Sequence, residues 1–354
     1  MRRITKKRLP LVEPAVDPAS GFATADELNS AYQNRDRRLA FPTTGSAAAR
    51  KIWRSNLTQA LRKTLRLKEL GKVPVPTFDV LSEVDCGDYV RQKIVYTTLP
   101  GSRVPAYLLK PHSYGVGDQL AAAICPHGHV PGAKDNVVGV TRPVGVAYGH
   151  ELAKRGIVVL APDNAGMGER DVSESRKRTG TTGCFLAWSR LNQMGLDLTG
   201  LRVLDLMAGV NLLSNLEGVD ERRIGCAGLS GGCWLSQVLT ALEPRIKAVV
   251  LSGFFTSFVQ TTWHGHCVCH HPFGIGQLCD MPDISALIAP RPQFVESGIS
   301  DTPYPHEPAF SMVRQAYELQ GAPDAIDRHR YRGGHMFNGK KSIPWLVDRL
   351  TEEN

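Results

Sequence analysis

The sequence contains no long hydrophobic run. In a chain of 354 residues, no apolar stretch approaches the roughly 18 consecutive apolar residues that a membrane-spanning helix needs. The basic N-terminus, MRRITKKRLPLVEPAV, is not followed by the apolar core of about 7–15 residues that secretory signals carry. We therefore expect no membrane partner and no export signal, and we predict a cytoplasmic location.

The sequence also contains no Cys-x-x-Cys pair. Eight cysteines are spread along the chain, and Cys125 and Cys226 fall in apolar runs, where a thiol behaves as a small apolar group. This pattern is typical of a reduced protein. The one dense group, HGHCVCHHPFGIGQLC at 264–279, matches no common zinc-binding spacing. For this segment we expect a structural loop near a pocket, and for the chain no metal and no cofactor.

Aromatic residues are missing from the basic runs. The net charge is +8, and its basic residues gather at the N-terminus, in an early helical segment and around 176–178. None of these runs has the interleaved aromatics of a nucleic-acid motif. We interpret them as solvated surfaces and predict no nucleic-acid partner.

The segment at 46–70 has a helical pattern. Apolar side chains recur at every fourth position, arginine and lysine lie between them, and Gly71 ends the run. The apolar positions are Trp53, Leu57, Leu61 and Leu65. This spacing predicts an amphipathic helix that packs on a domain.

From Tyr89 onward, strand patterns and helical patterns alternate. Two segments of period two flank residues 100–101 and predict an antiparallel pair of strands. Continuous apolar runs follow, as in strands buried on both faces. These runs lie at 120–125, 157–161, 224–227 and 248–252. Helices are predicted at 144–155, after Thr199 as N-cap, and at 233–242. The alternation predicts an α/β fold with a mostly parallel, doubly wound sheet and helices on both faces.

The segment RIGCAGLSGGC, residues 223–233, carries a G-x-S-x-G motif between a predicted strand and a predicted helix. A serine hydroxyl is a good nucleophile only when it is held clear of the sheet, beside a base and facing N–H donors. A sharp strand-to-helix turn provides this position, and its glycines relieve the crowding. We predict that Ser230 is a catalytic nucleophile. The alternative is that the glycines form only a tight turn.

An activated serine needs a base, and seven histidines follow Ser230. His335 comes directly after Gly333-Gly334, just past a predicted last strand at 326–331. Small residues leave that loop free to bring the imidazole to the serine. We favour His335 over His306, which lies in an acidic loop, and over His329, which lies inside the strand.

The base in turn needs an orienting carboxylate. The first strand after the motif has no acidic residue near its end, whereas the second runs from Gln293 into a loop that contains Asp301. We favour Asp301, with Glu296 inside the strand as the alternative. The oxyanion donors are expected to be the N–H of Gly231 and one N–H from the loop after 120–125, at His129 or Gly128. The His127 side chain is expected to brace that loop.

These residues together resemble the α/β-hydrolase superfamily, in its acetyl xylan esterase-like and dienelactone hydrolase-like branch. The matching stretches are VPAYLLKP, PHGH, GIVVLAPDNAGMGER, RIGCAGLSGGCW, HCVC, ALIAPRPQFVESGISDTPYP and GGHMFNGKKSIPWL. The resemblance implies an α/β-hydrolase fold with Ser230 as nucleophile, Asp301 as acid and His335 as base. It further implies a serine carboxylesterase that acts on small or carbohydrate-linked acetyl esters.

We divide the chain into an N-terminal extension with the amphipathic helix, residues 1–85, and an α/β-hydrolase catalytic domain, residues 86–354. A small cap insertion is predicted at about 169–200. Candidates for lining the pocket are Arg170, Trp188, Arg190, Trp234 and Trp263. Two alternatives to the esterase stay open at this point: a serine peptidase or amidase of the same fold, and a non-catalytic binding protein on this scaffold.

Overall fold

The structure is a computed structural model that describes residues 24–99, 101–115, 117–172, 183–263, 266–302 and 304–352. The chain divides into two compact units, residues 1–35 and 36–354. The first unit contains helix α1 (Thr24–Gln33). The second unit contains the sheet and every candidate site residue. None of the helices in the described ranges has the length and apolar character needed to cross a membrane.

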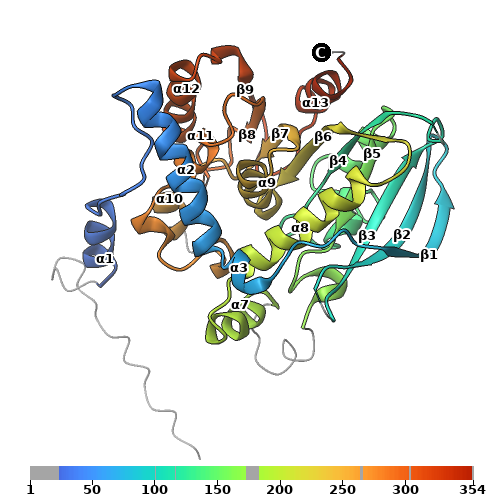
Figure 1. Cartoon of the computed structure of the whole chain (residues 1–354), viewed down its shortest axis with the longest axis horizontal. Helices are drawn as coiled ribbons and strands as arrows, with labels where there is room; N and C mark the ends of the chain where they lie inside the picture. The colour runs from blue at the N-terminus through green and yellow to red at the C-terminus, as the bar shows by residue number, and fades with distance from the viewer. Residues whose placement is uncertain are drawn as a thin grey trace, which may run out of the picture. The chain divides into compact units, whose positions relative to one another are not determined.

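A nine-stranded sheet forms the centre of the second unit (Figure 1). Its spatial order is β1-β2-β3-β5-β4-β6-β7-β8-β9. The strands are β1 (Phe78–Asp85), β2 (Tyr89–Thr97), β3 (Arg103–Pro111), β4 (Leu120–Ile124), β5 (Val158–Pro162), β6 (Val219–Leu229), β7 (Ile246–Ser252), β8 (Gln293–Gly298) and β9 (Ile326–Tyr331). The pairs β1–β2, β2–β3 and β3–β5 are antiparallel. The remaining neighbours in the order β5-β4-β6-β7-β8-β9 pair in parallel. The predicted α/β fold with a mostly parallel sheet is confirmed.

The strand order reverses at β4, because β5 lies on one side of it and β6 on the other. In sheets of this kind, ligands bind beyond the carboxyl ends of the strands at such a reversal. The loop after β4 and the Ser230 turn after β6 lie at this point. The topology therefore brings together two segments that are about a hundred residues apart in the chain.

Helices cover both faces of the sheet. On one face, α5 (Tyr148–Ala153) and α13 (Ser342–Thr351) pack on the strands, and on the other α8 (Leu198–Ser214) and α9 (Gly231–Leu242) do so. Ala121 and Ala123 of β4 join the core under α5 and α13, while Ile124 faces α8. A Cβ at Gly209 of α8 would lie 2.9 Å from the Ile124 side chain. The continuous apolar run in β4 is thus explained by burial on both faces.

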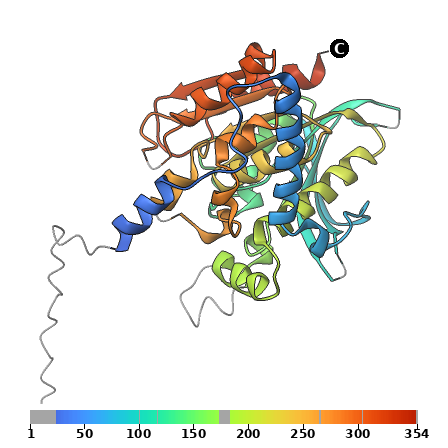
Figure 2. The same cartoon turned by 60° about the vertical axis from the view of Figure 1, so that its left-hand side comes forward.

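The remaining described helices are short or lie at the edges: α2 (Ala47–Thr64), α3 (Leu67–Leu70), α4 (Lys134–Val137), α7 (Gly183–Gln193), α10 (Phe258–Trp263), α11 (Met281–Ala286) and α12 (Ala309–Leu319). α2 lies beside α9 (Figure 2). α11 packs against α9, and α12 packs against α11. The helix predicted at 144–155 is shorter than expected, because Gly145 and Val146 pair with Phe337 instead of continuing the helix.

The single helix predicted at 46–70 is two helices. The Ser46 hydroxyl accepts from the Ala49 N–H at the start of α2, and the predicted apolar side chains are buried as expected. Arg66 adopts a left-handed backbone, φ 54°, and so separates α2 from α3. The predicted division at residues 85 and 86 falls between β1 and β2, which are paired strands of the one sheet.

The N-cap of α8 is Asp197, not Thr199 as predicted. The Asp197 carboxylate accepts from the Gly200 N–H at 2.8 Å, as an N-cap residue does. The Thr199 hydroxyl instead donates to the carbonyl of Cys269 at 2.8 Å. Asp197 is buried, and desolvation raises its pKa to about 6, although the Gly200 N–H and Arg202 act in the opposite direction.

We expect the stability of the Asp197→Asn variant, relative to that of wild type, to increase as pH rises. Because folding raises this pKa, the carboxyl's contribution to stability is fully present below about pH 4 and is lost as pH rises through about 6. Asparagine caps helices as well and does not ionise. The difference in unfolding free energy between variant and wild type should therefore change by about 3 kcal/mol between pH 4 and 7.5, measured by urea denaturation. A difference that does not change with pH would contradict this.

Candidate active site

Ser230 lies at a sharp turn between β6 and α9. Its backbone has φ 58° and ψ −119°, a conformation that costs energy for any residue other than glycine. The Ser230 N–H donates to the carbonyl of Ser252 at the end of β7, at 2.9 Å. The strand-to-helix turn predicted for the G-x-S-x-G motif is therefore present, and the strain at Ser230 is of the kind found at nucleophile turns.

The glycines of the motif allow close packing around this turn. A Cβ at Gly228 would lie 2.3 Å from the carbonyl oxygen of Gly232, and a Cβ at Gly232 would lie 2.2 Å from that of Pro126. A Cβ at Gly128 would meet the Leu229 carbonyl at 2.5 Å and the Ser230 Cβ at 2.9 Å. The loop after β4 therefore packs directly on the serine turn.

His335 and Asp301 form a hydrogen-bonded pair at the same edge of the sheet. Nδ1 of His335 is 2.8 Å from Oδ2 of Asp301, and the carboxylate is buried while about a third of the imidazole side chain is exposed. The two loops that carry them are joined by the Ser300 N–H donating to the Gly333 carbonyl, at 3.0 Å. The ring of His335 lies against Gly253, where an added Cβ would come within 3.2 Å of it. Gly253 directly follows Ser252, the residue that accepts from Ser230.

Glu296, the alternative acid, is directed elsewhere. It is buried within β8 and accepts four hydrogen bonds: from the Ser252 hydroxyl at 2.9 Å, the Ser342 hydroxyl at 2.6 Å, and the backbone N–H groups of Asn338 and Gly339 at 2.8 and 3.2 Å. Desolvation raises the pKa of Glu296, and these donors act in the opposite direction. Both carboxylate oxygens are thus used to hold the segment after His335, and the structure brings Asp301 to the imidazole.

His127 braces the loop after β4, as predicted. Its Nε2 accepts from the Asn164 N–H at 3.0 Å, so its Nδ1 carries the proton and donates to the Gly128 carbonyl at 2.8 Å. The ring is fully buried, and desolvation lowers its pKa to about 4. A neutral imidazole with one donor and one acceptor nitrogen satisfies both contacts.

Rings line the space between His335 and the serine turn. Tyr304 lies 5.3 Å from His335 and 5.0 Å from Phe254, measured between ring centroids. Phe254 in turn packs against His266 and His270. A Cβ at Gly231 would lie 2.9 Å from Nε2 of His270, so these rings reach the residue next to the nucleophile. Tyr304, Phe254, His266 and His270 thus form an aromatic wall that extends from His335 to the residue beside Ser230.

Comparisons with known proteins show the family of the chain. Residues 32–351 match the model of the Abhydrolase family. The chain belongs to the Abhydrolase family. A curated relative of this family member, "Putative hydrolase YtaP" from Bacillus subtilis (strain 168), is 26% identical over 245 residues, which cover 66% of this chain and 78% of the relative. The resemblance predicted from the sequence motifs is confirmed.

Solved structures share the fold of this Abhydrolase family member. A "putative acetyl xylan esterase (BF1801)" from Bacteroides fragilis NCTC 9343 has a TM-score of 0.78 at 19% identity, covering 94% of this chain and 95% of that one. "Methylesterase BT1017" has a TM-score of 0.65 at 22% identity, with 92% and 67% covered. A glucuronoyl esterase from Solibacter usitatus has a TM-score of 0.59 at 13% identity, with 90% and 100% covered. At these identities the likeness shows the fold, and the esterase names agree with the predicted enzyme class.

A buried lysine anchors the loop after β4 in this Abhydrolase chain. Nζ of Lys134 lies 2.7 Å from Oδ2 of Asp163, and it also contacts Glu169. The side chains of Lys134 and Asp163 are 3% and 0% exposed. Burial lowers the pKa of Lys134, but the two carboxylates outweigh it and raise the pKa above its usual value. The charged pair fixes the loop that continues from the predicted oxyanion donors.

We expect Lys134→Met to lower the free energy of unfolding by about 3–5 kcal/mol, because it leaves the Asp163 carboxylate buried without its cation. Lys93→Met is the matched control: Lys93 pairs with the same Glu169 at 2.9 Å, but its side chain is 30% exposed, so its loss should cost below about 1 kcal/mol. Urea denaturation of both variants measures the difference. Equal losses in the two variants would contradict the assignment.

The predicted cap is described in part, because residues 173–182 lie outside the described ranges. Arg170 donates to Asp205 at 2.7 Å, and Trp234 is buried, with its indole N–H donating to Thr199. Both are packing residues. Arg190 is exposed, Trp188 is half-buried on α7, and the Trp263 side chain is outside the described part.

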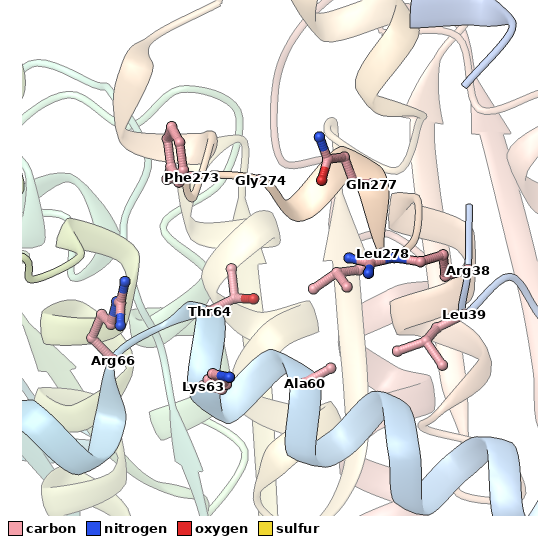
Figure 3. A pocket seen from close by; sticks show the side chains of 10 residues that line it. All are labelled: Arg38, Leu39, Ala60, Lys63, Thr64, Arg66, Phe273, Gly274, Gln277 and Leu278. Atoms are coloured by element: carbon pink, nitrogen blue, oxygen red, sulfur yellow. The ribbon is translucent and has the colours of Figure 1, made fainter. Parts of the chain in front are cut away.

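Two hollows lie near these elements. One, of about 610 Å³, adjoins the loop after β4 and α7, and its lining includes His129, Lys134, Glu169 and Cys184. The other, of about 580 Å³, lies between α2 and residues 273–278, with Arg38, Lys63 and Arg66 around it (Figure 3). None of the candidate catalytic residues lines this second hollow. Ser230, Asp301 and His335 do not line the first hollow either, but His129, whose N–H is a predicted oxyanion donor, does.

Proposed function

We propose that the protein is a serine carboxylesterase that hydrolyses small or carbohydrate-linked acetyl esters through Ser230, His335 and Asp301. The observation that carries the proposal is the 2.8 Å contact between His335 and Asp301, at the strand ends where Ser230 adopts φ 58°. A serine on a strained turn, with an imidazole oriented by a buried carboxylate nearby, is the constellation that performs acyl transfer.

The hydrogen bond to Asp301 determines which nitrogen of His335 is available as the base. Nδ1 donates its proton to Asp301, so Nε2 is the free base. Nε2 takes the proton of the Ser230 hydroxyl as its oxygen bonds to the ester carbon. The backbone N–H groups of Gly231 and of His129 or Gly128 donate to the oxyanion that forms. His335 then gives the proton to the leaving alkoxide, and water repeats the cycle to release the acid from the acyl-enzyme.

The aromatic wall supports a short acyl group. Phe254, His266 and His270 are packed on one another with centroids 4.4–5.2 Å apart, and His270 reaches Gly231 beside the nucleophile. We expect these packed rings to limit the length of the acyl chain on this side. The structural relatives named acetyl xylan esterase and glucuronoyl esterase support a carbohydrate ester as substrate.

An ester panel tests the proposal. We expect hydrolysis of p-nitrophenyl acetate to exceed that of the butyrate and octanoate esters, and acetylated xylo-oligosaccharides to be deacetylated. A p-nitroanilide of the same acyl group tests the peptidase or amidase alternative and should not react. Each substrate is run with wild type and with Ser230→Ala as the background. Cleavage of the anilide at a rate similar to the ester, or no hydrolysis of any ester, would refute the proposed function.

A further inference from the structure

Four metal-binding side chains meet beside the loop after β4. They are His129, Cys184, Cys267 and Cys269, and their ligand atoms all lie within 4.8 Å of one another. His129 comes from the loop after β4, Cys184 from the start of α7, and the other two from the turn at 267–270. All three cysteines are free thiols. Three segments far apart in the sequence thus contribute to one cluster.

The distances in the cluster are close to those of a tetrahedral metal site. Nε2 of His129 is 3.4 Å from Sγ of Cys184 and 3.3 Å from Sγ of Cys269. With zinc–sulfur and zinc–nitrogen bonds of about 2.3 and 2.0–2.1 Å, a tetrahedral ion separates nitrogen from sulfur by about 3.5 Å and two sulfurs by about 3.8 Å. His129 Nε2 already lies at about this distance from the sulfurs of Cys184 and Cys269, and the three sulfurs need to approach one another by no more than about 1 Å.

A buried arginine supplies an independent second observation. Arg202 on α8 is 2% exposed. Its guanidinium donates to the Ala165 carbonyl at 3.0 and 2.7 Å and to Sγ of Cys184 at 3.1 Å. Across the described ranges, no carboxylate lies within ion-pair distance of it. A buried cation needs a compensating charge. Three thiolates and one divalent cation carry a net charge of −1, which the Arg202 charge balances.

We propose that His129, Cys184, Cys267 and Cys269 bind one zinc ion in a closed tetrahedral site. Three thiolates and one imidazole form a donor set that suits zinc. All four positions are filled by protein ligands, so the ion is structural and does not activate water. It ties the loop that carries the predicted oxyanion donor to α7 and to the turn at 267–270. The hydrogen bond from Arg202 to Sγ of Cys184 would help to orient this ligand, as hydrogen bonds to metal ligands commonly do.

The proposed site departs from the expectation of no metal drawn from the sequence. Within 264–279 the spacing matches no zinc motif, because two of the four ligands lie outside the segment. His266 and His270, which made the segment look dense in ligands, are bonded to each other through their Nδ1 atoms at 2.8 Å. The inference does not depend on the proposed reaction, since metal content is measured without turnover.

Metal analysis of the full-length protein, purified without chelator and under reducing conditions, tests the proposal. By inductively coupled plasma mass spectrometry, we expect about one zinc ion per wild-type chain. The Cys184→Ser and Cys267→Ser variants should each contain less than about a tenth of that amount. Cys279→Ser is the matched control, because Cys279 is buried in the same stretch of chain but lies outside the cluster. It should retain the zinc.

Replacement of the bound metal in wild type by cobalt(II) gives a second readout that needs no variant to fold. We expect the visible absorption of tetrahedral cobalt(II) and a thiolate-to-cobalt charge-transfer band in the near ultraviolet. Three results would each overturn the proposal: wild type without stoichiometric zinc and without this spectrum, a disulfide among the three cysteines found by peptide mass mapping, or full zinc content in folded Cys184→Ser. Another metal in stoichiometric amount would overturn the assignment to zinc.

Discussion

Ser230→Ala should lower kcat for p-nitrophenyl acetate by about 10⁵–10⁶-fold, the range found when a triad nucleophile is removed. The reason is that the acyl-enzyme can no longer form, and what remains comes from substrate binding and the oxyanion donors. Steady-state kinetics over a range of enzyme concentrations give the value. Circular dichroism and thermal unfolding should change little, since alanine differs by one oxygen.

The matched control is Ser236→Ala. Ser236 is a buried serine in α9, and its hydroxyl has no hydrogen-bond partner within the described part of the chain. This variant removes the same atom from a buried serine six residues further along the chain and should keep kcat within about twofold. If Ser230→Ala retained more than a few per cent of wild-type activity, or if both variants lost activity equally, Ser230 would not be the nucleophile.

Asp301→Asn should lower kcat by about 10⁴-fold, because an amide in place of the carboxylate favours the wrong tautomer of the histidine and does not stabilise its charged form. The fold should persist, since asparagine keeps the size of the side chain. KM should change much less than kcat, because the Asp301 carboxylate is buried against His335 and acts through it. A loss below about tenfold would show that another group orients His335.

Glu296→Gln provides the contrast to Asp301→Asn. The glutamine places an amide nitrogen where four donors converge on Glu296. Each buried donor left unsatisfied costs about 1–3 kcal/mol, so this variant should unfold at a lower urea concentration. Its folded fraction should keep kcat within about tenfold. A large loss of kcat with unchanged stability would instead make Glu296 the catalytic acid.

The fold and the positions of the candidate residues could be predicted because local signals and topology agree. Continuous apolar runs indicate parallel strands buried on both faces, and parallel strands place their carboxyl ends at one edge of the sheet. Ser230, Asp301 and His335 each follow such an end, so the sequence alone predicts their proximity. The choice between Asp301 and Glu296 depended on whether the acid lies inside the strand or after it, and the structure pairs Asp301 with His335.

Other features depend on contacts that the sequence does not display. β1 is an edge strand with mostly exposed side chains, so no burial pattern distinguishes it from an extension. Arg66 ends α2 through a left-handed backbone that arginine rarely adopts. The cysteine–histidine cluster escaped prediction because its ligands come from three segments, and a ligand-spacing rule detects only residues that are close in the chain.

The proposed mechanism requires that the Ser230 hydroxyl is the nucleophile and that His335 activates it. Labelling with an organophosphate ester, followed by peptide mass spectrometry, tests it most directly. We expect one phosphoryl group per chain, located on Ser230, with activity lost in proportion, and much slower labelling of His335→Ala. Labelling at another residue in step with inactivation, or full inactivation without any adduct on Ser230, would contradict it.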